Sequence, residues 1–371
     1  MPRDYVAPLK QHHRDFEAAR RVLLEWMAAR LPQAGELRIG PIQTPTGTGV
    51  ANETLLFDAS WAEGGTRVDT GFAARLGTTD PLWMDHDVSR QYQMYQVLAD
   101  VPGLPIPQPV GYEADPGVLG TPFFVAQRIE GQVPPDRPHF TKDGFVAQAT
   151  PRQRRDMWED AVRHLARLHR VDSGRVRFLE RPELGGSGLE QELRHFRNYF
   201  DWARGKREDE TMERGWEWLE ANLPAPAPTS LSWGDARIGN MIFHDFRVRA
   251  ILDWDQVSLA GPEADLAWWI QMDRFAWELL PGIGSPDELI ELWEAETGWQ
   301  VQNLHWHRVF TAFRLAAVMF KLHAQMHAQG LEGKATYELA LKTGSIEQLA
   351  ILLGLPLPGP STTRVARLLR H

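Results

Sequence analysis

The chain has 371 residues, a formal net charge of −9 and no cysteine. These values exclude disulfides, cysteine-ligated metals and a thiol nucleophile, and they argue against a nucleic-acid-binding surface. No apolar run reaches the roughly 18 residues that a membrane span needs, and residues 1–5 lack a secretory signal pattern. We therefore expect a cytoplasmic enzyme with no membrane or nucleic-acid partner, long enough for two lobes.

The first third of the chain predicts helices and a small sheet. Residues 12–31 and 84–99 carry apolar side chains at helical spacing. Short β-rich runs occupy residues 37–43, 50–60, 66–76, 108–113 and 122–129. Residues 44–52 are rich in Thr, Gly and Pro, which is typical of a turn. Residues 1–130 are therefore predicted to form a β-rich N-terminal lobe.

The rest of the chain, residues 131–371, predicts a larger helical lobe. Helical spacing is found at residues 152–170, 189–204, 211–222, 263–281, 286–296, 304–329 and 335–353. One β-rich segment, residues 229–254, interrupts these helices. A small β-rich part followed by a large helical part predicts an α+β, bilobal fold.

The β-rich segment carries the residues that point to chemistry. It predicts a loop with Asp235 and Asn240, then two strands joined by a tight turn at residues 244–247, the second ending in Asp253. A hairpin of this length brings residues 240 and 253 to the same end. Carboxylate and amide oxygens suit Mg²⁺, and two aspartates with an asparagine match the phosphoryl-transfer template. Each residue alone would be explained as a turn residue, but the spacing of all three favours catalysis.

These stretches resemble the aminoglycoside phosphotransferase-like family, small-molecule relatives of the protein kinases. The resemblance rests first on Trp233-Gly-Asp-Ala-Arg-Ile-Gly-Asn240, Leu252-Asp-Trp-Asp255 and Ala260-Gly-Pro-Glu-Ala-Asp-Leu-Ala-Trp268. It continues in Gly49-Val-Ala-Asn-Glu-Thr54, Leu119-Gly-Thr-Pro-Phe-Phe-Val125 and Leu165-Ala-Arg-Leu-His169. The chain is most similar to the actinobacterial-type branch, and it also resembles the kinase-like domain attached to some acyl-CoA dehydrogenases. A protein-kinase-like bilobal fold is therefore expected.

The resemblance implies a role for each matching residue. Asp235 would be the catalytic base, and Asn240 and Asp253 would hold Mg²⁺. Asp265 would brace the catalytic loop. The resemblance also implies binding of ATP or GTP. The phosphates would be covered by Thr46, Gly47, Thr48, Gly49 and Asn52. The backbone around Gln127 and Ile129 would bind the adenine edge. The acceptor would be a hydroxylated small molecule.

The sequence departs from the family at the strand lysine that contacts the nucleotide phosphates. Only six of the 40 basic residues are lysine, and none lies between Lys10 and Lys142. The matching strand offers Arg75, which can also bind two phosphate oxygens. The usual helix glutamate is replaced by Gln91, so the ion pair of the family is missing. The loop histidine of the family is Trp233, which we expect to fill space.

These departures keep a second hypothesis open, a nucleotide-binding regulatory module without turnover, or pseudokinase. A protein kinase is disfavoured because little chain separates Asp253 from the helix expected at residue 263. The aromatic residues on the helices between 189 and 222 suggest either core packing or an acceptor pocket. The sequence leaves the acceptor open among aminoglycosides, macrolide-like compounds and hydroxyacyl thioesters, and it leaves the oligomeric state open.

Overall fold

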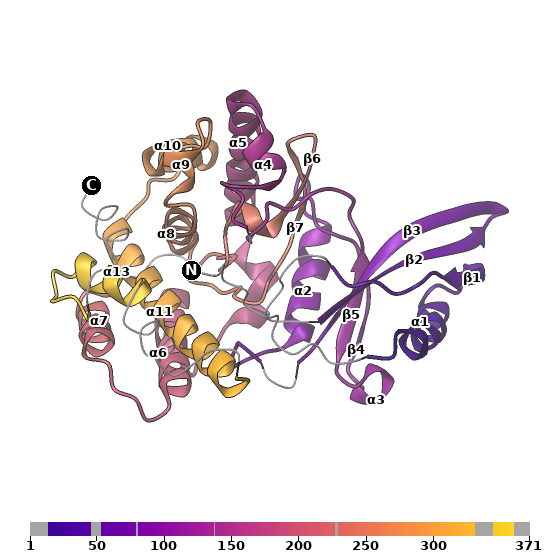
Figure 1. Cartoon of the computed structure of the whole chain (residues 1–371), viewed down its shortest axis with the longest axis horizontal. Coiled ribbons are helices and arrows are strands. Elements are labelled where there is room, and N and C mark those ends of the chain that lie inside the picture. Colours follow the sequence, from indigo (N-terminus) through magenta and orange to yellow (C-terminus); the bar gives the residue numbers. More distant parts are fainter. Residues whose placement is uncertain are drawn as a thin grey trace.

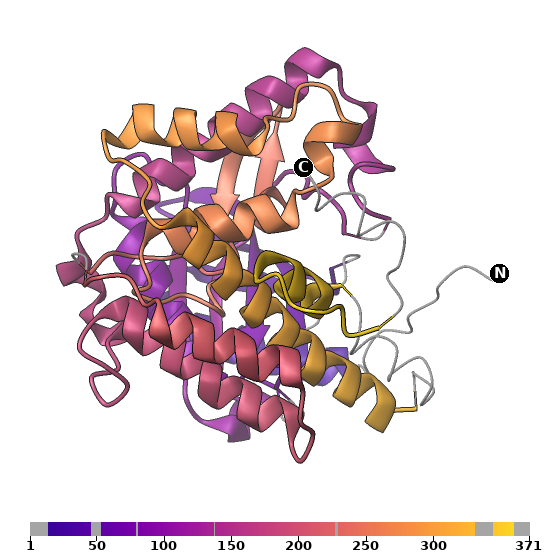
Figure 2. The ribbon, with the colours of Figure 1, turned by 90° about the vertical axis from the view of Figure 1, so that its left-hand side faces the viewer.

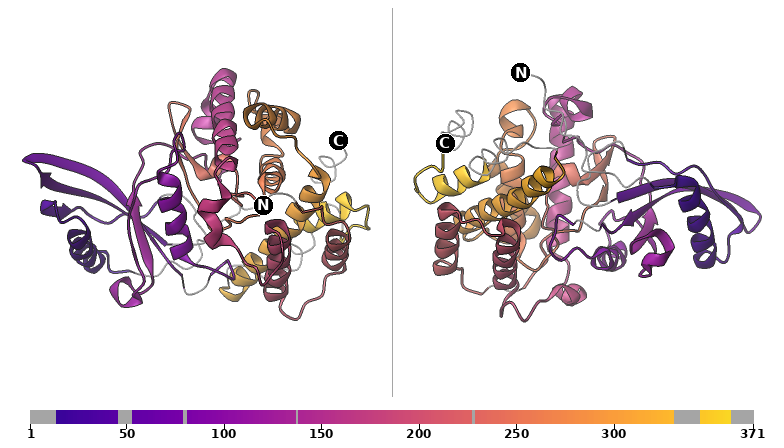
Figure 3. Two further views of the ribbon diagram at one scale, coloured as in Figure 1. Left: turned by 180° about the vertical axis from the view of Figure 1, so that it is seen from behind. Right: turned by 60° about the horizontal axis from the view of Figure 1, so that its bottom comes forward.

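The computed structural model describes residues 14–45, 53–78, 81–136, 138–226, 229–330 and 344–359. Figure 1 shows a β-rich N-lobe, which we define as residues 14–130, beside a larger helical C-lobe, residues 131–359. The predicted α+β bilobal fold is therefore confirmed. Two further views in Figure 3 show the N-lobe lying to one side of the helices. No helix in the described ranges is long and apolar enough to cross a membrane.

The N-lobe is built on a five-stranded antiparallel sheet with the order β1-β2-β3-β5-β4. The strands are β1 (Gly35–Ile39), β2 (Glu53–Glu63), β3 (Thr66–Leu76), β4 (Pro109–Glu113) and β5 (Phe123–Gln127). In the register, Arg75 of β3 lies between Thr54 of β2 and Phe124 of β5. The predicted strand of Arg75 is therefore in the middle of the sheet.

Helices cover both faces of this sheet. They are α1 (Phe16–Arg30), α2 (Val88–Ala99) and the short α3 (Pro116–Leu119). Alternate side chains of a strand point to opposite faces, so Phe72, Ala74 and Leu76 join α1 in one apolar core. Arg75 projects from the other face, which α2 covers through the contact of Tyr95 with Phe124. Since α2 lies between the sheet and the C-lobe (Figure 1), Arg75 faces the C-lobe.

The chain crosses between the lobes at Gly131, next to backbone hydrogen bonds with the C-lobe hairpin. Gln132 and Phe243 exchange two backbone hydrogen bonds of 2.8 Å. Gly131 has a φ of +154°, and a Cβ there would lie 2.5 Å from Ile242 Cγ2 and from the Phe243 carbonyl oxygen. Only glycine allows so close an approach, so the connection between the lobes is held in one place.

The C-lobe consists of helices around one short hairpin. Its helices are α4 (Gly144–Gln148), α5 (Pro151–His169), α6 (Gly188–Arg204), α7 (Glu210–Ala221), α8 (Pro262–Met272), α9 (Ala276–Leu279), α10 (Pro286–Thr297), α11 (Leu304–Ala328) and α13 (Ser345–Leu352). The hairpin is β6 (Met241–His244) with β7 (Arg247–Ile251). Capping boxes begin α5 at Thr150 and α10 at Ser285, which satisfies the free N–H groups of the first turn.

Two apolar cores stabilise the C-lobe. One joins α5, α8 and α10 to the hairpin, and the other joins α6, α7, α11 and α13. Figure 2 shows α6 and α7 at the bottom of the view. Helices α8 and α11 contact each other across the boundary, so residues on both can reach the loop that contains Asp235.

The helices expected over residues 12–31 and 84–99 begin later, at Phe16 and Val88, and two other predicted helices differ more from the structure. The helix expected over residues 263–281 is broken, because the backbone leaves helical geometry at Asp273 (φ −93°, ψ 8°) and the Ala276 N–H donates to the Asp273 carbonyl in a turn before α9. Of the helix expected over residues 335–353, α13 covers the C-terminal half, and residues 331–343 lie outside the described residues.

Candidate active site

One buried carboxylate anchors the loop that carries Asp235. Asp265, on the first turn of α8, is fully buried. Its Oδ1 accepts hydrogen bonds from Ser232 Oγ and the Gly234 N–H, both at 2.8 Å. Its Oδ2 accepts the Trp233 N–H at 2.6 Å. Asp265 thus braces the backbone directly before Asp235, as the sequence resemblance implied.

Asp265 is itself oriented by a chain of donors from two other helices. His169 Nε2 of α5 lies 2.9 Å from Asp265 Oδ2, and Trp293 Nε1 of α10 lies 2.9 Å from His169 Nδ1. An indole N–H can only donate, so Nδ1 is the acceptor and the imidazole proton is on Nε2. His169 therefore donates to Asp265, and three helices converge beneath the loop.

Gly234 allows this loop to pack tightly against the segment after β7. It has a φ of +89°, and a Cβ there would lie 2.0 Å from the Gln256 carbonyl oxygen. Arg314 of α11 is buried and donates from Nη2 to the Gly234 carbonyl at 3.1 Å. The loop is therefore held from α11 as well as from α8.

The Asp235 side chain is partly exposed and has two close protein neighbours. Its Oδ1 accepts a 2.7 Å hydrogen bond from Trp268 Nε1 and lies 3.3 Å from Arg237 Nε. The Asp235 carbonyl accepts the Asn240 side-chain amide at 3.0 Å, which closes the loop between the two predicted site residues. A carboxylate held in this way can accept a proton from a bound hydroxyl.

The structure brings Asn240 and Asp253 to the same end of the β6–β7 hairpin. The Leu252 N–H donates to the Asn240 carbonyl at 2.9 Å. Asp253 has a φ of +62°, a conformation that few residues other than glycine adopt. Its backbone is held there by Trp233, whose Nε1 lies 3.0 Å from the Asp253 carbonyl oxygen. Trp233 is therefore a buried packing residue, as expected from the sequence.

The chemistry of these two side chains fits a Mg²⁺ ion. The amide nitrogen of Asn240 is used by the Asp235 carbonyl, so the Asn240 Oδ1 is the atom left for a cation. The Asp253 side chain is 32% exposed. Among the described residues there is no group of three or more His, Cys, Asp or Glu that could hold a metal. One carboxylate and one amide suit an ion whose other ligands are water and phosphate oxygens.

Arg75 reaches across the lobes to two carboxylates. Its Nη2 lies 3.3 Å from Asp253 Oδ1 and 2.9 Å from Asp255 Oδ2. Gln91 of α2 donates a hydrogen bond to the other oxygen of Asp255, whose side chain is only 4% exposed. Arg75 and Gln91 therefore meet through Asp255, which supplies the negative charge that the helix residue lacks.

These contacts shift the pKa values of the site in opposing directions. Burial disfavours the charged form of Arg75, but Asp253 and Asp255 outweigh it and raise the pKa of the guanidinium. Burial raises the pKa of Asp253, while the Arg75 charge opposes that change. Arg75 thus stays firmly charged beside the two residues that fit Mg²⁺.

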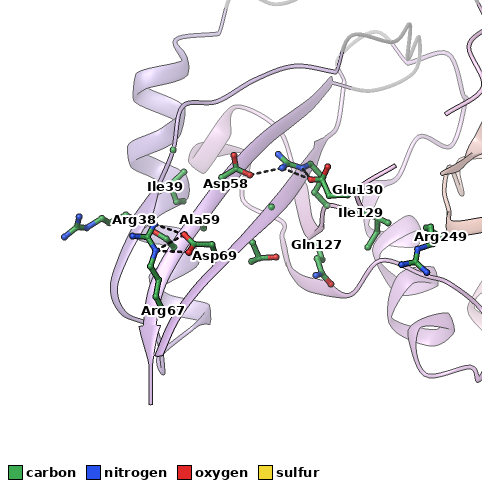
Figure 4. A pocket seen from close by; sticks show the side chains of 15 residues that line it. Arg38, Ile39, Asp58, Ala59, Arg67, Asp69, Gln127, Ile129, Glu130 and Arg249 are labelled. Carbon is green, nitrogen blue, oxygen red and sulfur yellow. Dashed lines mark hydrogen bonds and ion pairs between the residues drawn. The ribbon is translucent and has the colours of Figure 1, made fainter. Parts of the chain in front are cut away.

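The predicted adenine-edge residues line a cavity of about 710 Å³ on the same face of the sheet as Arg75. Figure 4 shows Gln127 and Ile129 with charged side chains from β1, β2, β3 and β7 around it. The Gln127 N–H already donates to the Gln108 carbonyl, and the Arg128 N–H to the Gly71 carbonyl, both at 2.8 Å. Of the three residues 127–129, Ile129 is therefore the one whose backbone N–H remains a candidate donor to adenine, which stays a prediction. Residues 46–52, predicted to cover the phosphates, lie outside the described residues.

A second group of charges lies close to Asp235. Arg237 forms an ion pair with Asp136, with nitrogen–oxygen distances of 2.6 and 3.0 Å. Burial disfavours its charge, but Asp235 and Asp136 outweigh it and raise the pKa of Arg237. Burial also raises the pKa of nearby Asp273 to about 7. Sequence reasoning missed this group, because residues 136, 237 and 273 are brought together only by the fold.

The structure places three of the aromatic residues predicted as core or acceptor pocket in the core. Phe196, Tyr199 and Phe200 are buried in the second core, whereas Trp202 is exposed. Trp268, which the sequence analysis did not assign, contacts Asp235 directly. The sequence could have indicated this contact, because Trp268 follows Asp265 by three residues and both therefore lie on one face of the helix.

Comparison with curated proteins finds relatives among acyl-CoA dehydrogenases. The chain is 26% identical over 285 residues to acyl-CoA dehydrogenase family member 10 from Mus musculus, covering 71% of this chain and 25% of that protein. It is 27% identical over 273 residues to family member 11 from Gallus gallus, covering 69% and 34%. The chain spans only a quarter to a third of the length of these relatives.

Solved structures share the fold at low sequence identity. A proposed aminoglycoside phosphotransferase from Ralstonia eutropha superposes with a TM-score of 0.66 at 19% identity, covering 90% of this chain and 98% of that one. An ethanolamine kinase from Plasmodium vivax gives 0.56 at 13% identity, covering 94% and 92%. The model of the phosphotransferase enzyme family matches residues 66–300, which contain Arg75, Asp235, Asn240 and Asp253. The chain therefore belongs to the phosphotransferase enzyme family.

Proposed function

We propose that this protein is a small-molecule kinase that transfers the γ-phosphoryl group of ATP or GTP to a hydroxyl group of its acceptor. The observation that supports this most strongly is the convergence of Asp235, Asn240 and Asp253 on one braced loop and hairpin. Arg75 reaches this point from the N-lobe. A carboxylate, two cation ligands and a phosphate-binding cation are the parts that phosphoryl transfer needs.

In the proposed reaction, Asp235 binds the acceptor hydroxyl and takes its proton as the oxygen forms a bond to the γ-phosphorus. The bond between the γ-phosphorus and the bridging oxygen breaks, and the nucleoside diphosphate leaves. Asn240 and Asp253 would hold Mg²⁺, which when bound neutralises phosphate charge. Arg75 would contribute a second positive charge on the phosphates. Most of the acceleration would come from positioning and electrostatics.

The test is the Asp235→Asn variant in an assay of ADP formation with MgATP and a panel of hydroxylated acceptors. We expect the variant to bind MgADP like the wild type in calorimetry and to lose transfer by at least about 100-fold, since a general base contributes that much. Glu210→Gln serves as a matched control, because Glu210 lies in an exposed ion pair with Arg214 on α7. Full transfer by Asp235→Asn would refute the base assignment.

The same assay separates the kinase from a regulatory module without turnover. A module would bind nucleotide stoichiometrically and give no ADP with any acceptor. The panel should contain hydroxyacyl thioesters as well as aminoglycosides and macrolides. The thioesters are included because the curated relatives carry this segment in chains named acyl-CoA dehydrogenases.

A further inference from the structure

Trp268 forms a direct hydrogen bond with the proposed catalytic base. Its Nε1 lies 2.7 Å from Asp235 Oδ1, and the residue is 2% exposed. Trp268 follows Asp265 by three residues on α8, so both side chains leave the helix on the same face. One turn of α8 therefore fixes the loop backbone through Asp265 and the side chain of the base through Trp268.

The two oxygens of Asp235 have different surroundings. Both protein neighbours of the carboxylate, Trp268 Nε1 and Arg237 Nε, lie on Oδ1. Within the part of the chain that the structure describes, no group donates a hydrogen bond to Oδ2. An oxygen that already receives a strong donor is the poorer proton acceptor, so Oδ2 is the atom left to receive the proton of a bound hydroxyl.

The indole is in turn held by a buried cation. The guanidinium carbon of Arg314 lies 4.7 Å from the centre of the Trp268 ring, which is a cation–π distance. Arg314 also donates to the Gly234 carbonyl, one residue before Asp235. Rotation of the indole away from Asp235 would therefore break packing with α11, so the donor is fixed before any acceptor binds.

We propose that Trp268 is a positioning residue for phosphoryl transfer, which holds Asp235 by Oδ1 so that Oδ2 faces the acceptor. This inference rests on the proposed function. It predicts that Trp268→Phe, which keeps the ring and removes the donor, lowers kcat by about 10- to 100-fold, the loss expected from a misplaced reacting group. The affinity for MgADP should change by less than about twofold, because Trp268 contacts the base and not the residues proposed to bind the nucleotide.

Trp306→Phe is the matched control. Trp306 is equally buried, on α11, and its Nε1 donates to the Leu219 carbonyl at 3.1 Å, away from the catalytic loop. This variant also loses the hydrogen bond of a buried indole, here to a neutral carbonyl, but should keep the wild-type kcat. A Trp268→Phe kcat no lower than that of Trp306→Phe would overturn the proposal.

A double-variant comparison tests whether Trp268 acts through Asp235. In the Asp235→Asn background, Trp268→Phe should change the residual rate by less than about twofold, because residues acting as one unit are not additive. An unchanged 10- to 100-fold effect in that background would refute the positioning role. If Asp235→Asn itself retains full transfer, the proposed function fails instead, so the two failures are distinguishable.

A spectroscopic measurement needs no acceptor. In protein with ¹⁵N-labelled tryptophan, the indole signal that is absent in Trp268→Phe is assigned to Trp268. This signal should move in Asp235→Asn, while the Trp306 signal, assigned in the same way, stays in place. A Trp268 signal that does not move in Asp235→Asn would show that the hydrogen bond is missing and would overturn the proposal.

Discussion

The anchoring role of Asp265 leads to a quantitative prediction for Asp265→Asn, a change that keeps the shape and removes the charge. Asp265 accepts hydrogen bonds from Ser232 Oγ, the Gly234 N–H, the Trp233 N–H and His169 Nε2. In asparagine one of the two oxygens becomes an amide donor. The oxygen that replaces Oδ2 must remain an acceptor, because the Trp233 N–H can only donate and His169 cannot change tautomer without losing its hydrogen bond from Trp293. The amide nitrogen must therefore turn toward Ser232, whose hydroxyl can rotate to accept.

In that arrangement the Gly234 N–H faces another donor in a buried site. A buried donor left without a partner costs about 1–3 kcal/mol, and the bonds that remain lose the strength that a charged acceptor gives them. We therefore expect Asp265→Asn to lower the free energy of unfolding by about 3–5 kcal/mol, in the range found when a buried charged network is broken. The rate of transfer should fall as well, because Gly234 precedes Asp235.

The assay is denaturant unfolding followed by circular dichroism, with Glu210→Gln as the control. The control breaks an exposed ion pair between neighbouring turns of a helix, which contributes only about 0.3–0.5 kcal/mol. The reasoning is refuted if Asp265→Asn unfolds within about 1 kcal/mol of the wild type. Such a result would mean that the loop finds other partners when Asp265 loses its charge.

Three further perturbations test other parts of the site. Arg75→Ala should raise the calorimetric Kd for MgADP by at least about 10-fold, since charge-assisted hydrogen bonds contribute about 1.5–3 kcal/mol, and an unchanged Kd would remove Arg75 from the nucleotide site. Burial raises the pKa of Asp273 to about 7, above its value of about 4 in the unfolded chain. As the pH rises from about 4 to 7, the unfolded chain loses this proton while the folded protein keeps it, so the free energy of unfolding falls by up to about 4 kcal/mol. Asp273→Asn should therefore gain stability relative to the wild type over this range and level off above it, and a difference independent of pH would contradict the assignment. Gly234→Ala should abolish transfer, because its Cβ would lie 2.0 Å from the Gln256 carbonyl oxygen, and full activity in the ADP assay would show that the loop can shift without loss.

Sequence reasoning succeeded where the information is local. Asp235, Asn240 and Asp253 lie within 19 residues of each other, and a hairpin with a tight turn determines which end each of them occupies. The helix of Asp265 and its bracing role followed from a motif in the next segment. The break after α8 was missed because an apolar pattern continues through it, while the non-helical backbone conformation of Asp273 leaves no mark in that pattern.

The contacts that complete the site could not be read in this way. Asp255 is separated from Arg75 by 180 residues, and Arg314 is separated from Gly234 by 80. Nothing in the local pattern of either residue signals its partner, because the pairing depends on how the two lobes and the two helical cores are placed. The missing helix glutamate could be recognised from the sequence, but its replacement by Asp255 could not.

Asp255 binds two elements of the N-lobe at once. One of its oxygens contacts Arg75 of β3, and the other accepts a hydrogen bond from Gln91 of α2. Asp255 belongs to the C-lobe, while Arg75 and Gln91 belong to the sheet and helix of the N-lobe. Opening the lobes would therefore pull Arg75 and Gln91 away from the same carboxylate at once. We therefore expect any movement of the lobes to displace the Arg75 guanidinium and α2 together, because both are bonded to the same carboxylate.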